Sequence, residues 1–243
     1  MKKLLILLVL AGTPAPTLAS GGESVKLDPV KIDLSDRASL QSGARIFVNF
    51  CLSCHSASYM RYSRMGHDLG ISEELVKENL LFAADKVGDL MKAVMPKEDA
   101  KLWFGVAPPD LSLVTRARKP EWFYTYMRSF YRDTKSPSGW NNTVFPHVAM
   151  PHVLYEWQGD QRALFKKDAH GVEVFAGFEL ERPGTKSKDK YDADMRDLTN
   201  FMVYLGEPAK LVRYKIGIYV LIFLAVFLVF AYLLKKEYWK DIR

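Results

Sequence analysis

Apolar residues recur at helical spacing in the first third of the chain. Leu40, Ala44, Phe47 and Cys51 follow one another at steps of four, three and four. This spacing places all four side chains on one face of a helix. Serine and aspartate at residues 35–36 are both favourable N-caps. The pattern therefore predicts a helix that starts there and brings its buried face to Cys51.

Three later stretches also predict helices. Residues 72–94 begin with Ser72, a favourable N-cap, and continue with two glutamates that suit the amino end of a helix. Residues 121–131 form a stretch rich in aromatic side chains. Residues 192–205 place apolar side chains at steps of three, four and three, and Gly206 then favours a helix end.

The segments between these helices carry weaker patterns. Residues 20–34 are polar and predict a surface arm, and residues 56–70 and 133–146 predict irregular structure. Residues 172–178 alternate weakly between apolar and other side chains, which predicts one short strand. We therefore expect a mainly α fold with inserted loops.

Both ends of the chain predict membrane targeting. Residues 1–19 combine two lysines, a short apolar run and small residues at a cleavage position, as in a cleaved signal peptide. A retained anchor is the alternative, but the apolar run is far shorter than the roughly 20 residues that a spanning helix needs.

A longer apolar run lies near the carboxyl end. Ile216 to Leu234 is a stretch of 19 residues without a charge, about 28 Å as a helix, with aromatic residues toward both ends. A buried core helix is the alternative. We expect an exported domain at 20–210, a membrane anchor at 211–234 and a cytoplasmic tail at 235–243.

The charge distribution argues against a nucleic-acid-binding protein. The formal net charge is +6, but residues 20–210 carry 26 basic and 26 acidic side chains. The excess therefore lies beside the apolar runs at the two ends, where basic residues serve membrane topology. One local exception is an acidic region at 68–89, which either forms a solvated face or docks a basic partner.

Cys51-Leu52-Ser53-Cys54-His55 matches the attachment motif of c-type haem. The two cysteine sulfurs bond covalently to the porphyrin, and the adjacent histidine binds the iron as an axial ligand. A thioredoxin-like redox pair would need a βαβ setting, and none is predicted here. A structural zinc site needs four ligands, and the chain has only two cysteines.

The second axial ligand decides the chemistry of a haem. An open iron position permits ligand binding or peroxide chemistry, whereas a methionine sulfur closes it and raises the potential. Met150 is the strongest candidate because Pro146 and Pro151 stiffen the loop on both sides of it. His147 or His152 is the alternative, which would give a bis-histidine haem.

Pro108 and Pro109 predict a rigid, extended segment that can pack against a porphyrin face. Arginines are suited to binding haem propionates, because a guanidinium makes bidentate hydrogen bonds to a carboxylate.

An ordered set of motifs resembles the cytochrome c1 family, the haem subunits of bacterial cytochrome bc1 complexes. The resemblance covers nearly the whole mature chain. Its marks are CLSCH (51–55), APPDLS (107–112), TRAR (115–118), AMPH around Met150, and LGEPA (205–209) before the apolar run.

The resemblance implies a class I cytochrome c-like haem domain with one haem c and one carboxyl-terminal transmembrane helix. It implies thioether bonds from Cys51 and Cys54, axial ligation by His55 and Met150, and packing of Pro108 and Pro109 beside the ring. The propionate-binding arginine and tyrosine of the family correspond to Arg118 and Tyr124, with Arg116 as a rival.

The resemblance also implies a function in electron transport. The haem would accept an electron from the Rieske iron–sulfur protein and pass it to cytochrome c, in a complex that includes cytochrome b. The chain would not be an enzyme on its own. It would lie in the inner membrane with its haem domain in the periplasm. The alternative is a membrane-anchored haem subunit of a terminal oxidase or another respiratory complex.

Overall fold

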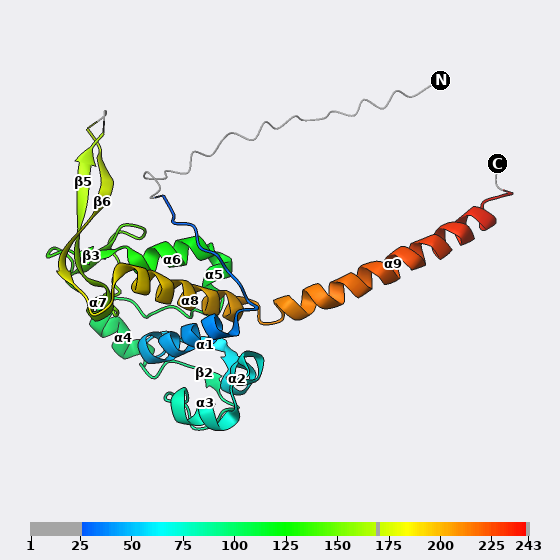
Figure 1. Cartoon of the computed structure of the whole chain (residues 1–243), viewed down its shortest axis with the longest axis horizontal. Coiled ribbons are helices and arrows are strands. Elements are labelled where there is room, and N and C mark those ends of the chain that lie inside the picture. The colour runs from blue at the N-terminus through cyan, green and yellow to red at the C-terminus, as the bar shows by residue number, and fades with distance from the viewer. Residues whose placement is uncertain (1–25, 169–170, 242–243) are drawn as a thin grey trace, which may run out of the picture.

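A computed structural model describes residues 26–168 and 171–241 (Figure 1). Its elements are, in order, α1 (Arg37–Ile46), the π-helical turn η1 (Phe47–Cys51), β1 (Ala57–Arg61), α2 (Tyr62–Leu69), α3 (Glu73–Asn79), β2 (Leu90–Met91), α4 (Lys97–Phe104), α5 (Val114–Ala117), α6 (Pro120–Arg128), β3 (Phe130–Arg132), β4 (Trp140–Asn142), α7 (Tyr155–Gln158), β5 (Gly159–Lys167), β6 (Glu173–Pro183), α8 (Lys188–Gly206) and α9 (Lys210–Tyr238). The predicted mainly α fold is confirmed. The predicted signal peptide, residues 1–19, lies outside the described residues.

Helices α1 and α8 pack against each other at the centre of the body (Figure 1). The Asp36 side chain caps α1 by accepting a hydrogen bond from the Ser39 amide. Phe47 and Phe201 meet across the contact with ring centroids 5.7 Å apart. Met195 and Met202 on α8 are fully buried, as their helical spacing predicts.

Gly43 lets the two central helices approach closely. A Cβ atom at this position would lie 2.2 Å from the Asp197 carbonyl oxygen and 2.6 Å from the Phe201 Cβ. No side chain larger than hydrogen fits there unless α1 and α8 move apart.

The predicted helix at 72–94 is wrong beyond its first two turns. Ser72 does cap α3, but the helix ends at Asn79. The chain then turns back, and the Val87 carbonyl accepts a hydrogen bond from the Ser63 amide at 2.7 Å. Tertiary pairing with the segment after the cysteine motif therefore replaces the helix.

The other predictions of local structure need smaller corrections. Residues 56–70, predicted to be irregular, form β1 and α2, and the predicted loop at 133–146 contains β4. The aromatic helix predicted to reach residue 131 stops at Arg128, because Phe130 pairs with Asn142 in a two-stranded sheet.

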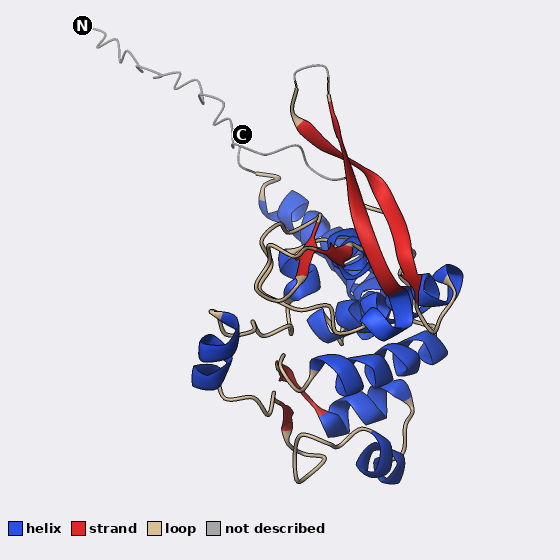
Figure 2. Cartoon of the chain, turned by 90° about the vertical axis from the view of Figure 1, so that its left-hand side faces the viewer, coloured by secondary structure: helices blue, strands red, loops and turns tan. Residues whose placement is uncertain are grey.

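The short strand predicted at 172–178 is one arm of a longer hairpin. Strands β5 and β6 pair in antiparallel fashion from Gly159↔Pro183 to Lys167↔Glu173. Figure 2 shows the hairpin standing off the helical body. The Gln161 side chain fastens its base by donating to the Arg128 and Phe130 carbonyls at 3.0 and 2.7 Å.

Helix α9 contains the predicted span and extends beyond it. Val212–Tyr238 has a mean hydropathy of 2.8, and none of its most apolar window is buried in the protein. At 1.5 Å per residue, 27 residues extend about 40 Å, which exceeds the roughly 30 Å hydrocarbon core of a bilayer. In Figure 1 this helix leaves the body at the end of α8.

We predict that Gly43→Ala destabilises the protein by about 1–3 kcal/mol, because the added methyl group forces α1 and α8 apart. Gly88→Ala is the matched control, since a Cβ there meets nothing within 4 Å. Thermal unfolding of the detergent-solubilised protein, followed by circular dichroism, measures both. Equal thermal unfolding midpoints for Gly43→Ala and Gly88→Ala would contradict close packing of α1 and α8 at Gly43.

Candidate haem site

The cysteine motif lies in a tight turn at the end of the first helical segment. Helix α1 continues into η1, where the Leu52 amide donates to the Phe47 carbonyl at 3.0 Å, five residues back. The Cys51 carbonyl then accepts from the amides of both Cys54 and His55, at 3.1 and 2.7 Å. This turn brings the second cysteine and the histidine back beside the first.

The two thiols differ in their surroundings. Cys51 is buried, whereas Cys54 is partly exposed. Burial, and secondarily the neighbouring Cys54, raise the pKa of the Cys51 thiol to about 12. A thioether bond would leave no ionisable proton on this sulfur, so its apolar setting suits the bonded form.

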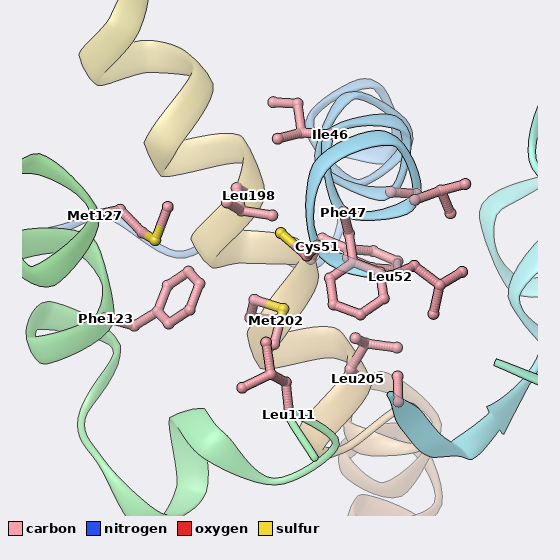
Figure 3. Close-up of a cluster of buried hydrophobic side chains, with 14 of the residues drawn as sticks. Ile46, Phe47, Cys51, Leu52, Leu111, Phe123, Met127, Leu198, Met202 and Leu205 are labelled. Carbon is pink, nitrogen blue, oxygen red and sulfur yellow. The ribbon is translucent and has the colours of Figure 1, made fainter. Parts of the chain in front are cut away.

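Apolar side chains from two helices surround Cys51. Figure 3 shows Phe123 and Met127 of α6 facing Met202 of α8 across the region beside this cysteine. All belong to the buried core. A porphyrin is a large flat apolar group, and these walls match its chemistry. The donor set, two thiols and an imidazole within five residues, therefore fits a covalently bound haem.

The ring of His55 is already oriented for metal binding. Its Nδ1 lies 2.8 Å from the Pro109 carbonyl oxygen. A carbonyl only accepts, so Nδ1 carries the proton and Nε2 keeps its lone pair for iron. Burial is the main cause that lowers the pKa of His55, and this keeps the imidazole neutral, as a ligand must be.

The predicted proline segment lies against the cysteine motif. The Leu111 amide donates to the Ser56 carbonyl at 2.8 Å. The Asp110 carboxylate accepts from the amides of Ser58 and Ser112 at 3.0 and 2.8 Å. These bonds fix the position of the Pro109 carbonyl. The predicted packing of Pro108 and Pro109 against the ring stays a prediction.

Met150 lies partly buried against the core. Its Sδ lies 3.4 Å from the Tyr126 hydroxyl, which donates to it. The loop before it is held by Asn142, whose side-chain oxygen accepts from the amides of Val144 and Phe145 at 2.9 and 3.2 Å. Hydrogen bonds therefore hold the loop before Met150, and the role of Met150 as the sixth ligand stays a prediction.

The two rival histidines have other surroundings. His152 is buried, with its ring stacked on Phe130 at 4.9 Å and edge-on to Trp140 at 5.0 Å. Burial lowers its pKa to about 4, so this imidazole is neutral in the core. His147 is exposed and adopts a left-handed backbone with φ of 60°. Neither ring nitrogen of His152 has a hydrogen-bond partner among the described residues, so the bis-histidine alternative stays open for this residue. His147 lies in the turn of an exposed loop.

Arg118 and Tyr124 each contact neighbours on or near α6. The exposed Arg118 guanidinium lies over the Trp122 ring at 5.0 Å. The Tyr124 ring lies under the Arg128 guanidinium at 4.6 Å, and Arg128 binds Asp192 at 2.6 and 2.9 Å. Their predicted binding of the propionates stays a prediction. The rival, Arg116, lies 3.7 Å from Glu207.

The acidic region at 68–89 divides into bound and exposed carboxylates. Asp68 accepts from Arg64 at 2.5 Å and from the Tyr204 hydroxyl at 2.9 Å, which ties α2 to α8. Glu73, Glu74 and Glu78 of α3 are exposed. Docking of a basic partner therefore stays a hypothesis, and α3 carries most of the exposed carboxylates of this region.

A cavity of about 690 Å³ lies elsewhere, between α1 and α3. Its lining includes Arg45, Asn49, Phe50, Leu75 and Phe82, and none of the predicted haem-binding residues. Neither cysteine of the motif nor His55 lines it, so it is not the candidate haem site.

Sequence reasoning missed Tyr126 and Asp110. Tyr126 stands in an aromatic run whose members look alike in sequence, and its hydroxyl partner lies 24 residues away. Asp110 was visible within APPDLS, but its partners Ser58 and Ser112 depend on the fold.

The chain is similar to known proteins over nearly its whole length. The model of the Cytochrome C1 family matches residues 31–175 and 182–242. The chain is 50% identical over 244 residues to the cytochrome c1 of Allochromatium vinosum, and the match covers all of both chains. It is 49% identical to a Nitrosomonas europaea protein named ammonia monooxygenase gamma subunit, over 100% of this chain and 99% of that one. The cytochrome c1 of Rhodospirillum rubrum is 24% identical, over 86% of this chain and 83% of that one.

The carboxylate of Asp110 generates a prediction about pH. Burial opposes its ionisation, but hydrogen bonds from Ser112 and Ser58 outweigh this and hold its pKa below the usual 3.8. The ionised Asp110 carboxylate therefore stabilises the folded protein at pH values above 3.8. This stabilisation is lost as the pH falls through the lower pKa that Asp110 has in the folded protein. We predict that Asp110→Asn costs about 1 kcal/mol at neutral pH, since the group is exposed, and that the difference shrinks in strong acid.

Urea unfolding at neutral and acidic pH checks this prediction. Asp85→Asn, an exposed aspartate after α3, is the control and should unfold like the parent protein at both pH values. If the free energy of unfolding of Asp110→Asn differs from that of the parent protein by the same amount at both pH values, the stabilising hydrogen bonds do not depend on ionisation of Asp110, and the prediction is wrong.

Proposed function

Because the chain belongs to the cytochrome c1 family, we propose that it relays single electrons from the Rieske iron–sulfur protein to cytochrome c. Members of this family carry covalently bound haem c and serve as electron-transfer subunits of bc1-type complexes. The finer assignment, with its two redox partners, is our proposal.

One observation carries the proposal: the Cys51–His55 turn with its histidine held at Nδ1 by the Pro109 carbonyl. Cys51 and Cys54 would hold the haem through thioether bonds, and His55 Nε2 would bind the iron. The bound haem supplies a one-electron couple. The protein supplies a fixed ligand geometry and an apolar enclosure around it.

Met150 would close the second axial position. A thioether ligand favours electron transfer over ligand binding, because no coordination site stays open. Its partly buried, hydrogen-bonded position supports this assignment. Arg118 and Tyr124 would serve the propionates. We accordingly assign no bond-making chemistry to the chain, and quinol oxidation would belong to the cytochrome b and Rieske subunits.

The chain is a membrane-anchored respiratory subunit, and its anchor is α9. We propose that residues 20–210 lie in the periplasm, that 211–234 cross the inner membrane, and that 235–243 form a cytoplasmic tail. Removal of a signal peptide at residues 1–19 would give this orientation. Covalent attachment of haem to a CxxCH motif outside the cytoplasm supports it.

The alternative function is a haem subunit of a terminal oxidase or another respiratory complex. The name of the Nitrosomonas relative raises a related alternative, a subunit of a monooxygenase. The match to the cytochrome c1 family over most of the chain favours the bc1-type complex over both.

We predict that the chain, purified from membranes through an affinity tag, brings cytochrome b and a Rieske iron–sulfur protein with it. Haem analysis and iron–sulfur spectroscopy identify these two subunits. Recovery with copper-containing oxidase or monooxygenase subunits instead would contradict the proposed complex. Solubilisation in a mild detergent is required, because none of the residues that the structure describes covers the apolar window of α9.

We predict that Met150→Leu opens the iron to carbon monoxide and lowers the midpoint potential. A thioether ligand favours ferrous over ferric iron, so its loss favours the oxidised haem. We expect the reduction equilibrium to shift toward the oxidised form by at least tenfold, which lowers the midpoint potential by about 59 mV. Met195→Leu, a buried core methionine, is the control and should keep the parent potential. Unchanged potential and no carbon monoxide binding in Met150→Leu would discard Met150 as the ligand.

A further inference from the structure

The hydroxyl of Tyr126 has one described hydrogen-bond partner, the sulfur of Met150, at 3.4 Å. We propose that Tyr126 is a positioning residue that raises the reduction potential of the haem through this hydrogen bond. The inference rests on the proposed ligation of iron by Met150. A thioether sulfur has two lone pairs, so one can bind iron while the other accepts from the tyrosine.

Two aromatic side chains hold the ring of Tyr126. Its ring stacks on Trp122 with centroids 5.0 Å apart and planes 14° apart, and it meets Phe130 edge-on at 5.1 Å. The residue is 9% exposed. Its hydroxyl therefore cannot turn to solvent without breaking these ring contacts, and it stays directed at the sulfur.

The same part of α6 also holds the methionine loop. The Asn142 side chain donates to the Tyr126 carbonyl at 2.8 Å, and its oxygen accepts from the amide of Val144 at 2.9 Å. Asn142 is fully buried. Tyr126 and the Met150 loop are therefore joined at two points, through the backbone and through the hydroxyl.

The electronic consequence follows from donation to the sulfur. A hydrogen bond to a ligand atom draws electron density away from it, and the ligand then donates less to the metal. Ferric iron gains more from that donation than ferrous iron does. Weaker donation therefore favours the reduced state, which raises the potential.

The test is Tyr126→Phe in the full-length protein, purified with its complex. The ring and its stacking contacts stay, and only the hydroxyl is lost. We expect the reduction equilibrium to shift toward the oxidised form by roughly three- to tenfold, the size of one hydrogen bond. Since tenfold corresponds to about 59 mV for one electron, a potentiometric titration resolves the shift.

Two further measurements separate electronic tuning from a structural role. The sulfur-to-iron charge-transfer band should persist in Tyr126→Phe, which shows that the methionine is still bound. Tyr131→Phe is the matched control, because this partly buried tyrosine packs edge-on against Phe165 of the hairpin at 6.3 Å. It should keep the parent potential.

A ring-fluorinated tyrosine at position 126 tests the opposite change, because it keeps the hydroxyl and nearly the same volume. Its hydroxyl donates a stronger hydrogen bond than that of tyrosine, so this variant should raise the reduction potential of the haem. If Tyr126→Phe does not assemble, this substitution decides the question alone. An unchanged potential in either variant, with the charge-transfer band present, overturns the inference and leaves the proposed function intact. Absence of the band in the parent protein overturns both the inference and Met150 as ligand.

Discussion

The hydrogen bond between His55 Nδ1 and the Pro109 carbonyl joins the cysteine motif to the proline segment. It is 2.8 Å long and links residues 54 positions apart. A histidine that follows a CxxC turn can rotate about its side-chain bonds, and a single acceptor at the right place removes that freedom. Proline suits the position because it presents a carbonyl from a rigid backbone and has no amide proton of its own.

The supports of that carbonyl lie in the next few residues. Asp110 and Leu111 bind the backbone of the segment that follows the cysteine motif. The imidazole and its acceptor are therefore fixed to one another twice, through the ring and through the backbone. If His55 binds the iron as proposed, this double fixation would keep the ligand in place when the iron changes charge.

The sequence alone was sufficient for elements that depend on local pattern. The capped helix into Cys51, the core face of α8 and the span within α9 each follow from spacing or length. Their side chains repeat at the period of the helix, so no knowledge of the rest of the fold is needed. The CxxCH motif is local in the same way, and the family match agrees with the chemistry that it predicts.

Other features could not be predicted because they depend on distant partners. The end of α3 is set by backbone bonds from Ser63 to Val87, and β3 exists only because Asn142 lies opposite Phe130. Tyr126 belongs to the same class. Its role arises from a sulfur in another loop, and an aromatic run in a sequence shows nothing of where one hydroxyl points.

The residues that we propose as the two axial ligands are held in different ways. On the His55 side, the acceptor is a backbone carbonyl, which substitution cannot easily remove. On the Met150 side, the donor is the Tyr126 hydroxyl, which a change of one atom to phenylalanine would delete without disturbing the stacked ring. The orientation of His55 is thus supported by the backbone, whereas the hydrogen bond to Met150 depends on a side chain. If Met150 binds the iron as proposed, substitution at Tyr126 would change the potential of the haem and leave the His55 side unaltered.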